Sequence, residues 1–125
     1  ITEHLIDIKM KINVFLTIIS LLLTGILGYS AFNIAKGDEN AILGGIVSGI
    51  CFAATLIPII GLQYNSSKLG VNIRLLAGLF FIVFLISNFG YALWGINMPS
   101  YIIVNGLILV IALAIFYKMM KINDI

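Results

Sequence analysis

Ionisable side chains are missing from the interior of the long apolar stretches of this sequence. Proton relays, voltage sensors and ion-coupled carriers place such a group inside a membrane span despite its cost. The chain has one histidine, His4, and one cysteine, Cys51, far apart along the sequence. One His and one Cys cannot supply the four ligands of a zinc site within a single chain. We therefore expect no catalytic residue, no metal and no cofactor, and the protein is not predicted to be an enzyme.

The side chains that remain for a functional role are polar but uncharged. Asn88 and Asn105 lie in the third and fourth apolar stretches, at similar depth if these stretches run antiparallel. An amide in hydrocarbon needs a hydrogen-bond partner, and such a bond contributes about 1 kcal/mol in membrane proteins. One interpretation is that the two amides bond each other or a nearby carbonyl. The alternative is that they line a polar vestibule together with Tyr91 and Asn33.

A second set of small or hydroxyl-bearing residues repeats along one helical face of the first apolar stretch. It consists of Thr17, Ser20, Thr24 and Gly28. This stripe either packs against small residues of the next stretch or faces an axis shared by several subunits, where it would wet a narrow pore. In the second stretch, Pro58 frees a backbone carbonyl and is predicted to bend the helix, which makes it a candidate hinge.

These residues must be positioned by helices that cross a membrane. The chain of 125 residues is 62% hydrophobic and 10% charged, which is too little charge to cover the surface of a soluble domain. The expected spans are residues 14–35, 42–62, 73–94 and 101–120, each long enough to cross a bilayer as a helix. The predicted fold is an all-α integral membrane protein, one domain over residues 1–125, with four transmembrane helices in two antiparallel hairpins.

The segment before the first span alternates apolar and charged residues. One helical face of this segment carries Ile1, Leu5, Ile8 and Ile12. This pattern favours a short amphipathic helix at the membrane surface over residues 1–13. A flexible start, or a soluble extension of the first span, is the alternative. No signal-peptide pattern precedes the first span, so the sequence is expected to lack its true start.

The second span has a helical face made almost entirely of small residues. The face consists of Ala41, Gly45, Gly49 and Ala53, with Gly44 and Ser48 beside it. Small residues let a neighbouring helix approach until the backbones touch, which is how helices associate in lipid. Gly45 and Gly49 form a G-x-x-x-G pair, a motif that does not distinguish a contact within the chain from one between chains. We expect this face to be the main helix-packing surface.

Basic residues are concentrated at one end of the predicted bundle. Six of the seven belong to that end, namely Lys9, Lys11, Lys68, Arg74, Lys118 and Lys121. The first link between spans holds only Lys36, beside Asp38 and Glu39. Because cytoplasmic segments carry the excess of Lys and Arg, both termini are expected in the cytoplasm. The expected location is a plasma or inner membrane.

A weak internal similarity relates the two halves of the chain. Residues 28–47 align with residues 90–109 when shifted by 62 positions. The matched pairs are Gly28/Gly90, Tyr29/Tyr91, Ile34/Ile96, Gly44/Gly106 and Ile46/Ile108. Composition alone gives roughly two such matches, so chance is one explanation. The other is a duplicated hairpin whose copies are related by an axis along the membrane normal.

Three functions fit these observations. The first is a homo-oligomeric pore or gated channel assembled through the small-residue faces, because four spans of this length enclose no water-filled route by themselves. The second is a non-conducting accessory or anchoring subunit that recruits a cytoplasmic protein partner through its termini and the link 63–72. The third is a carrier for a neutral or lipidic molecule, with Pro58 as its hinge. The expected partners are membrane lipid and further copies of the chain; a net charge of +2 does not indicate nucleic acid.

Overall fold

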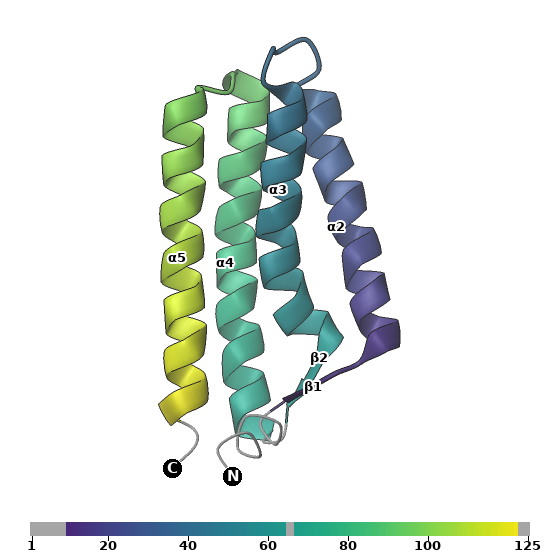
Figure 1. Cartoon of the computed structure of the whole chain (residues 1–125), viewed down its shortest axis with the longest axis vertical. Coiled ribbons are helices and arrows are strands. Elements are labelled where there is room, and N and C mark those ends of the chain that lie inside the picture. Colours follow the sequence, from purple (N-terminus) through teal and green to yellow (C-terminus); the bar gives the residue numbers. More distant parts are fainter. Residues whose placement is uncertain (1–9, 65–66, 123–125) are drawn as a thin grey trace.

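The computed structural model describes residues 10–64 and 67–122. Four long helices lie side by side in it (Figure 1): α2 (Val14–Ile34), α3 (Ala41–Leu56), α4 (Ser67–Trp94) and α5 (Met98–Ile122). Together with the π-helical turn that extends α3, all four are long and apolar enough to cross a membrane. The structure thus confirms the all-α architecture of a membrane protein.

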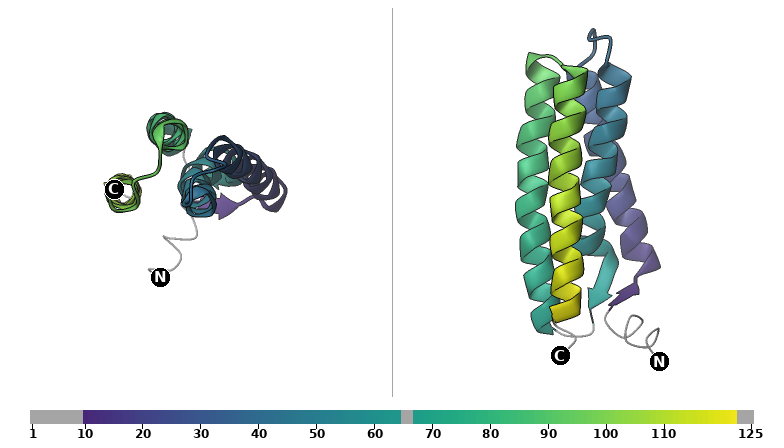
Figure 2. Two further views of the ribbon diagram at one scale, coloured as in Figure 1. Left: turned by 90° about the horizontal axis from the view of Figure 1, so that it is seen from above. Right: turned by 60° about the vertical axis from the view of Figure 1, so that its left-hand side comes forward.

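The helices form a layered bundle with α3 in the middle. Seen along the helices, α2 lies on one side of α3, and α4 and α5 lie on the other (Figure 2). The links 35–40 and 95–97 meet at one end, which we call the loop end. The start of α2 and the finish of α5 lie at the opposite end, which we call the strand end (Figure 1).

Two helices extend further than the apolar stretches that predict them. The third helix begins at Ser67, so most of the predicted link 63–72 is helical. Leu69 and Ile73 are buried on its inner face, four residues apart, which shows that this extra turn packs against the bundle. The fourth helix begins at Met98 rather than at residue 101. Hydropathy marks only the part of a helix suited to hydrocarbon, while the helix itself continues through the interface.

A short two-stranded ribbon lies at the strand end. Strand β1 (Met10–Ile12) pairs antiparallel with β2 (Leu62–Tyr64), with Lys11 opposite Gln63. The last residues of the predicted amphipathic helix over 1–13 are therefore extended, because β2 offers them backbone partners. Residues 1–9 of that prediction lie outside the described residues.

The predicted bend at Pro58 takes the form of a π-helical turn, Ile57–Gly61, that ends α3. Proline has no N–H and widens the helix at this point, which leaves carbonyl groups without their usual donors. The Tyr64 hydroxyl donates to the Pro58 carbonyl at 2.7 Å. Burial raises the pKa of Tyr64 to about 12, with the Arg74 charge acting in the opposite direction, so the phenol keeps its hydrogen at neutral pH.

Two other elements supply donors to this broken helix end. Arg74 of α4 donates from Nε to the Ile59 carbonyl and from Nη2 to the Leu62 carbonyl, both at 3.2 Å, and its guanidinium lies over the Tyr64 ring. The Gly61 carbonyl accepts hydrogen bonds from the Thr17 hydroxyl and the Asn13 N–H, both at 2.9 Å. The end of α3 is thus fixed by groups from α2, β2 and α4.

Candidate functional site

Four polar side chains meet in the interior between α3, α4 and α5. They are Ser48 on α3, Asn88 on α4, and Tyr101 and Asn105 on α5, each at most 2% exposed. We call these four residues the polar cluster. Tyr101 and Asn105 are four residues apart, so the helix turns both toward the interior. No member carries a charge at neutral pH.

Asn88 is the centre of the polar cluster. Its Nδ2 donates to Asn105 Oδ1 at 3.0 Å and to the Phe84 carbonyl at 2.9 Å. Its Oδ1 accepts from the Ser48 hydroxyl at 3.0 Å and from the Tyr101 hydroxyl at 2.7 Å. Both amide hydrogens and the amide oxygen therefore have partners. This mutual bonding of two amides is the contact that the first interpretation of Asn88 and Asn105 requires.

The Tyr101 hydroxyl joins α5 to α3. It lies 3.0 Å from the Gly44 carbonyl oxygen and 3.1 Å from the Ser48 hydroxyl, in addition to its contact with Asn88. The Ser48 hydroxyl can donate to Asn88 Oδ1 or to the Tyr101 oxygen, and the Tyr101 hydroxyl can donate to Asn88 Oδ1 or to the Gly44 carbonyl. Each arrangement gives both hydroxyl hydrogens an acceptor, which is what burial in a low-dielectric interior demands.

Apolar side chains flank the polar cluster on both sides. Toward the loop end the buried group is Ala35, Ala41, Ala92 and Ile96. Toward the strand end it is Cys51, Phe52, Leu56 and Phe84. Within the described part of the chain, buried apolar groups thus lie on both sides of the hydrogen-bonded side chains.

The stripe on α2 lies inside the chain. Ser20, Thr24 and Gly28 are buried, and Thr17 donates to the Gly61 carbonyl. Ser20 donates to the Thr17 carbonyl at 2.7 Å, within its own helix. The Thr24 hydroxyl is buried and has no hydrogen-bond partner among the described residues. The stripe thus makes the packing contacts with α3 that one of its two interpretations requires.

The small-residue face of α3 divides between two neighbours. Ala41, Gly44 and Ser48 are buried on the side of the polar cluster. A Cβ atom added at Gly45 would lie 3.1 Å from Phe32 Cβ and 3.3 Å from the Gly28 carbonyl oxygen, so Gly45 faces α2. The bare surface predicted as one packing face therefore serves contacts on both sides of α3.

Gly49 and Ala53 remain partly open on the outside of the bundle. A Cβ atom added at Gly49 would meet nothing within 4 Å. A groove of about 540 Å³ runs along this surface between α2 and α3. Its floor is made of small residues, Gly25, Gly28, Gly45, Gly49 and Ala53, and its edges include Tyr29, Phe32, Ile42, Ile46 and Ile50. We call it the α2–α3 groove.

Two residues of the predicted vestibule lie away from the polar cluster. Asn33 is exposed on α2. The Tyr91 hydroxyl lies 2.7 Å from the Ser100 hydroxyl on the surface, while the Tyr91 ring packs edge-on against the Tyr101 ring at 5.0 Å. The structure thus brings together Asn88 and Asn105 but not the other two members of that set.

The sequence pattern does not identify Ser48 and Tyr101 as the partners of the two amides. It predicts a role for Ser48 only through its small size, as part of the helix-packing face of the second span. The available signal is spacing, because Tyr101 lies one helical turn from Asn105, on the same face. Ser48 is recognised as a partner of the two amides only from the packing of α3 against α5. No local sequence pattern predicts that packing.

At the loop end, one carboxylate joins the two links. Asp38 Oδ2 accepts from the Ile96 N–H at 3.0 Å and its Oδ1 from the Asn40 N–H at 2.9 Å. Asn40 Nδ2 donates in turn to the Ile96 carbonyl at 3.1 Å. The N–H groups of Ile96 and Asn40 lower the pKa of Asp38 below its ordinary value of 3.8. The first link is thereby attached to the second hairpin.

Within residues 10–64 and 67–122, no three His, Cys, Asp or Glu side chains lie close enough to hold a metal ion. The chemistry available in the polar cluster is hydrogen bonding between neutral groups. Comparison with known proteins found no matching family model, no matching curated protein and no matching solved structure.

Proposed function

We propose that this chain is a non-conducting accessory subunit of a membrane complex, and that it pairs with a second copy of itself through the α2–α3 groove. The observation that carries the proposal is the inward placement of the polar side chains. Asn88, Asn105 and Tyr101 bond each other within one chain, and Ser20 and Thr24 face α3. The side chains of Asn88, Asn105, Tyr101 and Ser20 therefore have hydrogen-bond partners within the chain and are not free to wet a pore between subunits, and the α2–α3 groove is lined mostly by apolar atoms.

Pairing of two copies is supported by the shape of α3. Ile42, Ile46 and Ile50 are exposed at intervals of four residues, and the glycine floor of the groove runs beside them at the same interval. A ridge and a groove with equal spacing lie next to each other on one surface. Two copies related by a twofold axis can each lay the ridge in the partner's groove.

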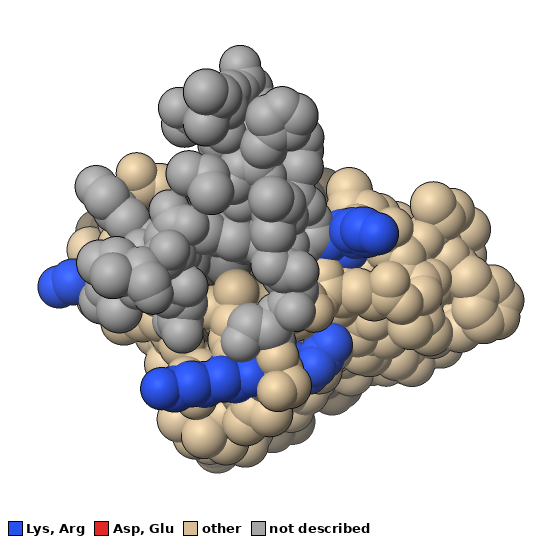
Figure 3. Space-filling model, turned by 90° about the horizontal axis from the view of Figure 1, so that it is seen from below, with Lys and Arg blue, Asp and Glu red and all other residues tan. Residues whose placement is uncertain are grey.

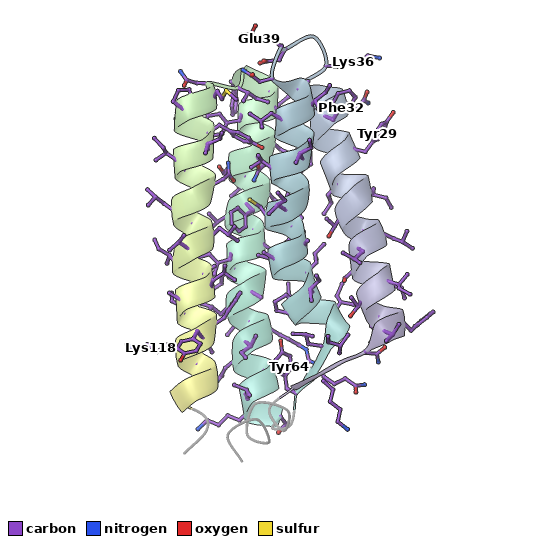
Figure 4. The ribbon with its side chains drawn as sticks, viewed as in Figure 1. Tyr29, Phe32, Lys36, Glu39, Tyr64 and Lys118 are labelled. Atoms are coloured by element: carbon purple, nitrogen blue, oxygen red, sulfur yellow. The ribbon has the colours of Figure 1, made fainter. Side chains whose placement is uncertain are left out.

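We also propose that the strand end faces the cytoplasm. Lys and Arg side chains surround that end (Figure 3), and Lys118 lies there, whereas Lys36 and Glu39 lie at the loop end (Figure 4). The two acidic residues within the described part of the chain, Asp38 and Glu39, are both at the loop end. This asymmetry is the one that the positive-inside rule associates with a cytoplasmic strand end.

The pairing is tested by the mass of the detergent-solubilised particle, measured by light scattering after chromatography. The native chain of 13.6 kDa is expected to elute as a dimer. Gly49→Leu fills the groove without a clash inside the chain and should give a monomer. Gly78→Leu is the matched control, because a Cβ atom at Gly78 also meets nothing within 4 Å and this residue lies outside the groove. A monomeric native particle, or a dimer that survives Gly49→Leu, contradicts the pairing.

Planar-bilayer recording tests the absence of conduction. The intact native particle is expected to produce no current across the bilayer, and discrete conductance steps would restore the pore hypothesis.

Orientation is tested by thiol labelling in a Cys51→Ala background. A cysteine at Glu39 should react from outside the cell, and a cysteine at Ser67 only after permeabilisation.

A further inference from the structure

A narrow slot lies between α3 and α5, beside the polar cluster, with a volume of about 180 Å³. Val47 and Ile50 form one wall, and Ile102 and Leu109 form the other. Ile50 and Ile102 are exposed on the outside of the bundle, so the slot opens laterally toward the lipid. It lies next to the α2–α3 groove on the surface of α3, and Ile50 borders both.

The size of the slot limits what can enter it. A helix with its side chains is about 10–12 Å wide and is too broad for this space. An apolar cavity of about 150 Å³ is known to hold one benzene molecule, so the slot takes a single hydrocarbon chain over a short length. Because it opens in the membrane-spanning part of α3 and α5, lipid chains are the molecules that surround it.

Asn105 gives this apolar slot a hydrogen-bond donor. It is 2% exposed and lines the slot. Its Oδ1 accepts from Asn88 and, at 3.6 Å, from the Cys51 thiol. Its Nδ2 carries two hydrogens, of which one is donated to the Tyr101 carbonyl at 2.9 Å. The second hydrogen has no acceptor in the described part of the chain.

We propose that the slot binds one ester-linked acyl chain of a membrane lipid, and that the ester carbonyl oxygen accepts a hydrogen bond from Asn105 Nδ2. The first methylene groups of the chain then lie between the two apolar walls. Asn105 is seven residues after Met98, roughly 10 Å along the helix. Because the 25 residues of α5 extend over roughly 38 Å and the hydrocarbon core is about 30 Å thick, Asn105 lies roughly 7 Å on the hydrocarbon side of the boundary at which lipid ester groups lie.

The proposal requires only that the helices cross a membrane and is independent of pairing through the α2–α3 groove. The experiment uses the full chain in phosphatidylcholine vesicles with a trace of phosphatidylcholine that carries a diazirine close to its ester. After illumination, mass spectrometry maps the labelled positions. Labelling is expected to concentrate on residues 47–51 and 102–109, above the level of other lipid-facing segments. Uniform labelling of all exposed segments would overturn the proposal.

Two further experiments test separately whether a chain enters the slot and whether its carbonyl bonds to Asn105. Gly106→Leu fills the slot, since a Cβ atom there meets nothing within 4 Å, and should lower labelling of residues 102–109 at least fivefold. Gly78→Leu should leave it unchanged, and equal labelling in both variants would show that no chain enters the slot. The trace diester probe should label residues 102–109 about threefold more in vesicles of diether phosphatidylcholine than in vesicles of diester phosphatidylcholine of equal chain length, because the ether host lacks the carbonyl and competes less for Asn105. Equal labelling in the two hosts would exclude the bond to Asn105.

Discussion

The two hairpins of this bundle are held together in different ways. In the α2–α3 hairpin the helices touch through glycine: a Cβ atom added at Gly28 would lie 3.1 Å from the Gly45 carbonyl oxygen and 3.5 Å from Gly49 Cα. In the α4–α5 hairpin the buried residues of α5, within its described side chains, are Tyr101, Asn105 and Ala112. The second hairpin therefore depends on hydrogen bonds where the first depends on close backbone packing.

This difference follows from the way in which helices associate in lipid. Burying a large apolar side chain between helices gains little when the alternative is hydrocarbon, so helices are joined by close packing or by hydrogen bonds. Matching positions of the weak internal similarity show the contrast. Gly44 is buried beside Ile96, whereas Gly106 is exposed with open space around it. Equivalent glycines thus sit in different environments in the two hairpins.

The largest effect is expected where glycine allows the backbones of α2 and α3 to meet. Gly28→Leu places a side chain against the Gly45 carbonyl and should force the helices apart. We expect a loss of about 3 kcal/mol in the free energy of unfolding, at the upper end of overpacking effects, measured by denaturant titration in micelles. Gly78→Leu is the control, because its Cβ site is open and it lies outside the α2–α3 groove. Equal losses in both variants would show that the close contact is not what holds this hairpin.

The next largest effect is expected in the polar cluster. Asn88→Ala removes four hydrogen bonds and should lower the free energy of unfolding by about 2 kcal/mol. Asn33→Ala, at an exposed asparagine of α2, should change it little. If the two alanine variants are equally stable, the hydrogen bonds contribute nothing beyond packing.

The labelling rate of the Cys51 thiol distinguishes opening of one hairpin from opening of the other. Its thiol is buried between α3 and α5, so maleimide should label it slowly in the native protein. Asn88→Ala should speed labelling several-fold, because α5 loses its hydrogen bonds from Asn105 and Tyr101 to Asn88, whereas Gly28→Leu should leave the rate near that of the native chain. Faster labelling in Gly28→Leu than in Asn88→Ala would mean that the two hairpins do not open independently.

The sequence predicted most of the fold because hydropathy and length are local properties. Four spans, their order and the bend at Pro58 follow from such properties. The ribbon of β1 with β2 was not predicted, since its strands are separated by the whole α2–α3 hairpin and contain only three residues each. The same limit applies to the polar cluster. Asn88 and Asn105 stand out in apolar stretches, but Ser48 becomes their neighbour only through the packing of α3 against α4 and α5.

An intermediate effect is expected at the strand end, where Arg74 fixes the end of α3. Arg74→Met keeps the apolar stem but removes the bonds to the Ile59 and Leu62 carbonyls. We expect a loss of about 1 kcal/mol and faster hydrogen exchange confined to residues 57–64. Lys68→Met is the control, because it removes a cation from the same helix end. Unchanged exchange in Arg74→Met would show that Tyr64 and Thr17 hold this turn without it.

The smallest effect is expected from the carboxylate that attaches the first hairpin to the second at the loop end. The N–H groups of Ile96 and Asn40 lower the pKa of Asp38, so the folded state favours the ionised form. Its stabilising effect is fully present above pH 3.8, the ordinary value, and is lost as the pH falls through the lower folded pKa. The melting temperature of the native chain should therefore drop more between pH 5 and pH 3 than that of Asp38→Asn. Glu39→Gln is the control that removes a neighbouring carboxylate, and its melting temperature should fall between pH 5 and pH 3 by as much as that of the native chain. If Asp38→Asn retains it as well, the charge of Asp38 does not help to hold the two hairpins together at this end, and the hydrogen bond from Asn40 to the Ile96 carbonyl remains with packing.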